Sequence, residues 1–235
     1  MADAPQRSNR TFWDWLHLLL PSVILLLGIT WLSVQQGLLA QQTNDQQRAT
    51  ALQIAHAQQQ ASILMAYQES ITDMLLHNDL LHARQTSIER LVAQIKTAEV
   101  LRQLDGDGKG ALLRFLYETK LINNDTPIIS LRELDAHGAN LRNVDLRDTN
   151  LFGIDLHSAD VRGANLSFAA MSYVNLTGAN LAGSDLHGSD MRNANLSGAN
   201  LSGANLKDVT NLTQEQLAKV KTLSGAIMLD GSIHH

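Results

Sequence analysis

Two short motifs each place a carboxylate and an imidazole two residues apart. They are Asp135 with His137 and Asp155 with His157, and the second follows the first by twenty residues. Carboxylate and imidazole groups bind divalent metal ions, and imidazole changes its charge near neutral pH. If the fold brings the four side chains together, they could form a metal site; the alternative is that they are ordinary solvated side chains.

Other chemistry has little support in the sequence. The chain has no cysteine, which excludes disulfides, thiolate metal sites and cysteine nucleophiles. Segment 105–110 is glycine-rich, but as a calcium loop it would carry Lys109 at the fifth position and Leu116 at the twelfth. It also lacks the serine or threonine that follows the lysine of a phosphate-binding loop, and we interpret it as a turn. No serine is placed against a histidine base, so we predict no catalytic residue, no cofactor and no enzyme activity.

The N-terminal part contains an apolar segment that could cross a membrane. Residues 16–34 include no Asp, Glu, Lys or Arg, and as a helix they would span roughly 28 Å, close to the hydrocarbon core of a bilayer. Trp13 and Trp31 stand at opposite ends of this run, where indole rings favour the lipid headgroups. We therefore predict an N-terminal tail over 1–11 and a transmembrane helix over 12–35 in contact with membrane lipid. A cleaved signal peptide is the alternative, although its apolar region would be shorter.

The charges around this segment indicate its orientation. Arg7 and Arg10 precede it, and the first positive residue after it is Arg48. Positive residues are enriched on the cytoplasmic side. We therefore expect a single-pass protein with a cytoplasmic N-terminus.

Residues 36–122 are predicted to form a helical stalk and a helical layer. The first part is rich in glutamine and has one apolar stripe at helical spacing, made by Ile54, Ala57, Ala61, Leu64, Ile71 and Leu75. This stripe could form a coiled coil that makes a homo-oligomer, or it could pack on the chain's own neighbouring helices. A capping box at Thr86 and Glu89 then predicts a second helix, and residues 111–122 a third.

The strongest signal in the sequence is a repeat of five residues. Leucine, or another apolar residue of similar size, recurs at fourteen consecutive positions, with a small or β-branched residue two positions earlier. The fourteen are Leu141, Leu146, Leu151, Leu156, Val161, Leu166, Met171, Leu176, Leu181, Leu186, Met191, Leu196, Leu201 and Leu206. Neither a helix nor a strand has a period of five, so the repeat predicts a solenoid whose units bury these residues by stacking.

The run GANLRNVDLRDTNLFGIDLHSADVRGANL resembles the pentapeptide-repeat family, whose consensus is Ala-Asp/Asn-Leu-x-x. The resemblance covers residues 131–209 and implies an all-β, right-handed quadrilateral β-helix with about four pentads per coil. The central leucine and the residue two before it would point inward. More weakly, WDWL together with LRQLDGDGKGALLRFLYETKLI resembles a membrane-anchored bacterial subgroup of this family, which implies the bacterial plasma membrane.

Both ends of the solenoid are expected to be covered. A capping box at Thr213 and Gln216 predicts a helix through Leu223, so residues 210–235 would form a C-terminal helical cap and tail. The helical layer that ends at Ile122 would cover the other end, because terminal repeats need a cap.

Four pentads per coil would stack residues that are twenty apart. Asp135 and His137 would then lie beside Asp155 and His157, which makes these four the candidate metal ligands. A second candidate is an outward, less polar group that could contact a partner, formed by Phe152, Phe168, Ala170 and Tyr173.

The sequence predicts a membrane-anchored structural protein that presents a β-helix as a binding platform for an unidentified protein. Some pentapeptide-repeat proteins mimic DNA and bind topoisomerases, which is the alternative function. Residues 131–209 carry six Lys and Arg against nine Asp and Glu, hence a charge of only −3, and the whole chain carries −5. A membrane anchor also suits a DNA mimic poorly, and we expect no nucleic-acid partner.

Overall fold

The computed structural model describes residues 12–235, with side chains from Leu19 onward. The chain divides into two compact units, Met1–Ala57 and Gln58–His235. The predicted tail over 1–11, with Arg7 and Arg10, and the side chain of Trp13 lie outside the described residues.

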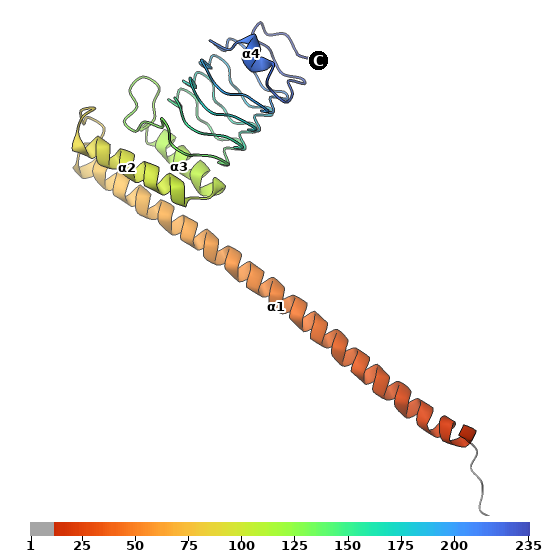
Figure 1. Cartoon of the computed structure of the whole chain (residues 1–235). Helices are drawn as coiled ribbons and strands as arrows, with labels where there is room; N and C mark the ends of the chain where they lie inside the picture. Colours follow the sequence, from red (N-terminus) through yellow and green to blue (C-terminus); the bar gives the residue numbers. More distant parts are fainter. Residues whose placement is uncertain (1–11) are drawn as a thin grey trace, which may run out of the picture. The chain divides into compact units, whose positions relative to one another are not determined.

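Among the described residues, the first unit contains the N-terminal part of α1 (Phe12–His77), which is one uninterrupted helix (Figure 1). Pro21 does not break it, and no boundary separates the predicted transmembrane segment from the predicted stalk. Every described side chain from Leu19 to Gln59 is exposed. Among the described residues, α1 is the helix that is long and apolar enough to cross a membrane, judged by length and composition alone.

The second unit begins with the rest of α1, against which α2 (Ile88–Gln103) and α3 (Gly106–Glu118) pack. Tyr67 and Ile71 of α1 are buried in this layer, and Leu64 and Leu75 are half-buried against it. The C-terminal half of the predicted apolar stripe therefore packs within its own chain. The N-terminal half, including Ile54, stays exposed.

The starts of α2 and α3 differ from the predicted ones. The N-cap of α2 is Ser87, one residue after Thr86, because its extended backbone lets its hydroxyl accept the N–H of Arg90 at 3.3 Å. Asp105 caps α3 by accepting the N–H of Gly108 at 2.9 Å. The glycine-rich segment predicted to be a turn is therefore the first turn of α3.

Close packing explains the glycines in this turn. A Cβ atom on Gly106 would collide with the carbonyl oxygen of Gly138, and one on Gly110 with that of Asn140. The N–H of Asn140 donates to the carbonyl oxygen of Gly106 at 2.8 Å. Helix α3 can therefore lie directly against the first coil of the repeat because these positions have no side chain.

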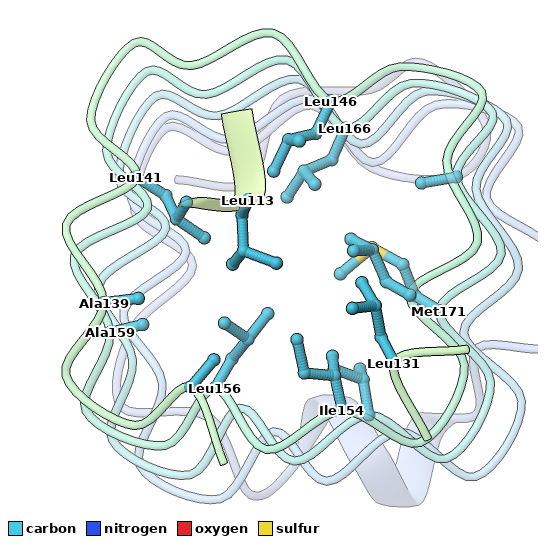
Figure 2. Close-up of a cluster of buried hydrophobic side chains, with 14 of the residues drawn as sticks. Leu113, Leu131, Ala139, Leu141, Leu146, Ile154, Leu156, Ala159, Leu166 and Met171 are labelled. Carbon is cyan, nitrogen blue, oxygen red and sulfur yellow. The ribbon is translucent and has the colours of Figure 1, made fainter. Parts of the chain in front are cut away.

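The repeat folds into a tube with a four-sided cross-section (Figure 2). Residues that are twenty apart pair in parallel, from Asp135 with Asp155 to Asp190 with Thr210. Each pairing is an isolated bridge, and in residues 12–235 no continuous strand forms. The expected strands are thus reduced to single bridges, because the chain turns a corner in every pentad.

The side chains of the consensus explain these corners. The Asn or Asp before the central residue accepts the backbone N–H two residues later, as Asn165 does from Ser167 at 3.1 Å. The residue two after the central one has a positive φ in every pentad from Glu133 to Asp208. Asn and Asp favour such turns by bonding to their own backbone.

The interior of the tube is lined mainly by apolar side chains. All fourteen residues at the central positions are buried, and so are the small residues two positions before them. Leu113 of α3 points into the end of the tube, where it lies among the side chains of the first coils (Figure 2).

The C-terminal segment differs from the predicted helical cap. The capping box of Thr213 and Gln216 is present, but α4 (Gln214–Leu217) is only four residues long. Residues 219–229 continue the ladder instead, and the N–H of Leu206 donates to the carbonyl oxygen of Ile227 at 2.8 Å. This extra coil satisfies backbone groups that the last repeats would otherwise leave unpaired.

Candidate functional site

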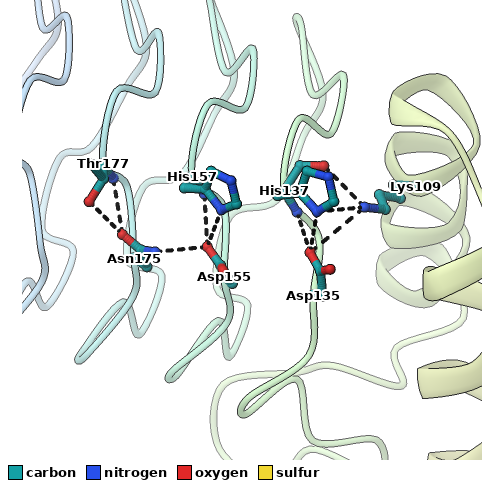
Figure 3. A network of polar contacts seen from close by, with 7 residues as sticks. All are labelled: Lys109, Asp135, His137, Asp155, His157, Asn175 and Thr177. Atoms are coloured by element: carbon teal, nitrogen blue, oxygen red, sulfur yellow. Dashed lines mark hydrogen bonds and ion pairs between the residues drawn. The ribbon is translucent and has the colours of Figure 1, made fainter.

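The structure brings the four candidate metal ligands together as two parallel rungs (Figure 3). Oδ1 of Asp135 lies 2.6 Å from Nδ1 of His137, and Oδ1 of Asp155 lies 3.0 Å from Nδ1 of His157. The two imidazole rings stack with their centroids 5.0 Å apart and their planes 12° apart. The twenty-residue spacing thus places both pairs on one wall.

Side chains from α3 and from the next rung of the tube contact these pairs. The ammonium group of Lys109, a buried residue of α3, lies 3.8 Å from Oδ1 of Asp135 and donates to the carbonyl oxygen of His137 at 3.1 Å. Nδ2 of Asn175 donates to Asp155 at 2.9 Å. Over the side chains that the structure describes, no three His, Cys, Asp or Glu residues are arranged to hold a metal ion. The contacts of Lys109 link α3 to the tube.

The environment of Asp135 favours its ionised form. Burial alone would raise the pKa of this carboxyl group. Hydrogen bonds from the backbone and side chain of His137, together with the charge of Lys109, outweigh burial and hold the pKa of Asp135 below its ordinary value.

Two of the predicted contact residues form a local aromatic pair. The rings of Phe152 and Tyr173 have centroids 5.4 Å apart, and the guanidinium carbon of Arg132 lies 5.6 Å from the centroid of Phe152. With Glu133 and Gly153 these residues line a shallow pocket of about 470 Å³. We call these five residues the aromatic pocket.

The other two predicted contact residues do not line this pocket. The ring of Phe168 meets His187 edge-on at 5.1 Å, and Phe168 accepts a hydrogen bond from Asn124 through its carbonyl oxygen. Ala170 is half-buried and forms a bridge of the ladder. The predicted group of four is therefore divided, and one half of it makes a pocket.

Tyr173 occupies an unfavourable backbone conformation. Its φ is 62°, and Phe168 has a φ of 58° at the equivalent place in the preceding pentad. Eight of the equivalent positions from 133 to 208 carry glycine, for which this conformation costs nothing. For other residues the left-handed conformation costs roughly 1–2 kcal/mol. A bulky aromatic residue that is half exposed is therefore kept here against the local backbone preference.

Two residues of these sites were missed by reasoning from the sequence. Arg132 stands twenty residues before Phe152, so the period of the coil would have placed it above that ring. Lys109 had no such signal, because its role depends on how α3 packs against the first coil.

Comparison with known proteins agrees with the repeat architecture. The family model for pentapeptide repeats matches residues 129–167 and 169–208 in eight copies. Among solved structures, the pentapeptide repeat protein alr5209 from Nostoc PCC 7120 is 30% identical, with 42% of this chain and 72% of that chain covered and a TM-score of 0.28. A pentapeptide repeat protein from the thylakoid lumen of Arabidopsis thaliana is 35% identical, with 38% and 66% covered and a TM-score of 0.23.

A third similar structure is QnrB1, described as a plasmid-mediated fluoroquinolone resistance protein. It is 19% identical, with 43% of this chain and 61% of that chain covered and a TM-score of 0.28. No curated protein matches the chain. From its repeats, its family model and its identity with alr5209, the chain belongs to the pentapeptide-repeat family, whose members form right-handed β-helices.

Proposed function

We propose that this protein is a membrane-anchored, non-catalytic binding platform whose aromatic pocket contacts another protein. In this proposal the tube is the right-handed quadrilateral β-helix of its family, and α1 anchors it in a bacterial plasma membrane. The N-terminus is cytoplasmic.

The observation that carries the binding role is the pocket in which Tyr173, in a strained conformation, pairs with Phe152 beside Arg132. Strained backbone conformations of bulky residues persist where another constraint holds them, and they cluster at functional sites. Tyr173 is 54% exposed, so burial in the tube does not explain why an aromatic residue is kept there. Beside it stand Phe152 and Arg132, and Tyr and Arg are the residue types that dominate the energetics of protein interfaces.

The anchoring role is supported by the exposed apolar part of α1. The most apolar window of 18 residues in this helix has a mean hydropathy of 1.8, and none of it is buried. A water-exposed surface of this kind would cost about 25 cal/mol for each Å² of apolar area left unburied. Lipid around the predicted span, residues 12–35, would remove that cost.

The alternative of a DNA mimic finds no support on the walls of the tube. Arg147 pairs with Asp145 at 2.9 Å, and Arg162 pairs with Asp160 at 2.5 Å. These arginines neutralise the charge of the carboxylates, so these positions do not contribute to the continuous negative surface that a DNA mimic would need.

The binding role is tested by chemical crosslinking in native membranes followed by mass spectrometry. The full-length protein with Phe152→Ala and Tyr173→Ala is expected to lose a partner that the unchanged protein captures. Phe168→Ala is the matched control, because it removes an aromatic residue of similar exposure and backbone conformation outside the pocket. Identical sets of captured proteins from all three would contradict the proposal.

The conformation of Tyr173 gives a second measurement. Tyr173→Gly relieves the left-handed strain but removes the ring contact with Phe152, which is worth about 0.5–1.5 kcal/mol. We therefore expect the thermal stability of this variant to be close to that of the unchanged protein while the partner is lost. A large loss of stability would show that Tyr173 has a structural role instead.

A further inference from the structure

Two outward columns of residues run side by side through the aromatic pocket. Residues that are twenty apart stack from rung to rung along the tube. The positions one and two after the central residues of four stacked pentads therefore form two adjacent columns. The first column is Arg132, Phe152, Ser172 and Arg192, and the second is Glu133, Gly153, Tyr173 and Asn193. We call these eight residues the paired columns, and five of them line the aromatic pocket.

The two columns are complementary in size within the middle rungs. Phe152 of the first column stands beside Gly153 of the second, which has no side chain. In the next rung the order is reversed, because the large Tyr173 stands beside Ser172, a small residue that is 7% exposed. Each column therefore carries one aromatic ring and, in the other middle rung, one low position.

The outer rungs of the paired columns are complementary in charge and hydrogen bonding. Arg132 and Glu133 have opposite charges, and their side chains are 64% and 80% exposed. At the other end both Arg192 and Asn193 are exposed, and the guanidinium group of the arginine can donate to an amide oxygen. In all four rungs, what one column presents fits what the other column presents.

We propose that the paired columns bind the paired columns of a second copy of the chain, with the two tubes side by side in the same direction. The pairing rests on the proposed function, because it makes a second copy the protein that the aromatic pocket contacts. A two-fold axis along the tubes brings the first column of each copy against the second column of the other. Phe152 then enters the pocket of the second copy at Gly153, and Tyr173 covers Ser172 of the second copy.

The charges select this direction of the two tubes. In the same direction, Arg132 lies opposite Glu133 of the second copy, and the four charges of the two copies alternate in sign around the axis. Tubes in opposite directions would instead place Arg132 opposite Arg192 of the second copy, and like charges that face each other weaken an interface. A second copy supplies both the fitting shape and the fitting charge by symmetry alone.

The length of the paired columns predicts that the pairing is weak in free solution. Rungs stack about 4.8 Å apart, so four of them make a strip of roughly 14 Å. We expect such a strip to bury less than the roughly 1,200 Å² of a stable interface. The membrane anchor of the proposed function offsets this, because confinement to one bilayer raises the effective concentration of the copies.

The absence of cysteine allows a direct test in the full-length protein. Copies with Arg192→Cys and copies with Asn193→Cys are expressed together, with tags of different size. Arg142→Cys with Asn143→Cys is the matched control, since these residues have the same types and pentad positions but lie two and a half coils away, on the opposite edge of the tube.

Under mild oxidation in native membranes, we expect several-fold more disulfide between differently tagged copies from the first pair of variants than from the control pair. The reason is that a disulfide requires Cα atoms within about 7 Å, which the proposed arrangement supplies on one edge only. Equal crosslinking of both pairs would indicate random encounters and would overturn the proposal, as would no crosslinking of the first pair.

An exchange of charges tests the arrangement a second time. Arg132→Glu, introduced with the cysteines at 192 and 193, places two carboxylates opposite each other and is expected to lower the crosslinking. Addition of Glu133→Arg restores opposite charges across the axis and is expected to restore crosslinking, although each single change alters an exposed residue in the same way. A double variant that crosslinks no better than Arg132→Glu alone would overturn the arrangement.

The pairing and the proposed function fail in different ways. The crosslinking and mass spectrometry of the binding test also show whether the protein captured through Phe152 and Tyr173 is a second copy. Loss of a different protein in the double alanine variant, without crosslinking at 192 and 193, would refute the pairing and keep the binding role. Identical captured proteins in all variants, again without this crosslinking, would refute both.

Discussion

Each residue of a pentad has a separate physical task in this protein. The central residue fills the tube, as Leu166 does, and the residue before it bonds to the backbone, as Asn165 does. The residue two positions after the centre takes the left-handed conformation that turns the corner. The outward positions remain available for contacts with other molecules, and Tyr173 places an aromatic ring at one that the backbone would leave to glycine.

Ionised Asp residues on the walls predict a fall in stability in acid. The side-chain hydrogen bond from Arg162 holds the pKa of Asp160 below its ordinary value, and burial only partly opposes it. A lowered pKa in the folded state adds stability above the unfolded value of about 3.9, and this stability is lost as the pH falls through the folded value. The melting temperature is therefore expected to decrease as the pH falls below about 4.

Asp160→Asn should weaken this dependence, because it removes one of the groups whose pKa differs between the folded and unfolded states. Thermal unfolding of the full-length protein in detergent at a series of pH values measures the effect. The same slope in the variant and in the unchanged protein would show that Asp160 does not contribute.

At the scale of elements, α3 packs against the first coil and covers that end of the tube. Leu113 fills its end, and Lys109 reaches the wall that carries Asp135 and His137. The two glycines at 106 and 110 allow this contact by leaving room for backbone atoms.

Gly110→Ala is expected to destabilise this junction. The added Cβ meets the backbone of Asn140, which cannot move without shifting the first coil. Such overpacking costs about 1–3 kcal/mol, measurable by urea unfolding of the full-length protein in detergent. Gly37→Ala is the control, because a Cβ atom at this position of α1 meets nothing within 4 Å. Equal stability of the two variants would contradict the close packing of α3.

At the scale of the whole molecule, the chain combines a unit that is one helix with a unit that carries the repeat. The first unit supplies the apolar surface, and the second supplies the aromatic pocket. The anchoring role and the binding role of the proposed function use different parts of the molecule, so each can be tested with the other left intact.

The proposed orientation predicts that the second unit lies outside the cytoplasm. In this orientation Arg7 and Arg10, which precede the predicted span, would lie on the cytoplasmic side. Lys207→Cys gives one exposed thiol in an otherwise cysteine-free chain. A thiol reagent that cannot cross membranes should label it in cells whose outer barriers have been removed. Labelling only after the plasma membrane is broken would contradict this orientation.

The sequence by itself determined the repeat, because each pentad interacts mainly with the pentads next to it and twenty residues away. A local pattern therefore contains the information for the buried positions such as Leu141, for the turns, and for the stacking of His137 on His157. The same period would also have placed Arg132 above Phe152.

Only the tertiary structure decided which segments outside the sequence repeat contact one another or contact the tube. The glycine-rich segment became the first turn of α3 because a coil lies against it, and residues 219–229 extended the ladder because its last backbone groups needed partners. The contact of Asp135 and His137 with Lys109 was decided there too, since its ammonium group reaches them from another element. Such contacts join segments with no common pattern, so their energies depend on shapes that exist only once the chain has folded.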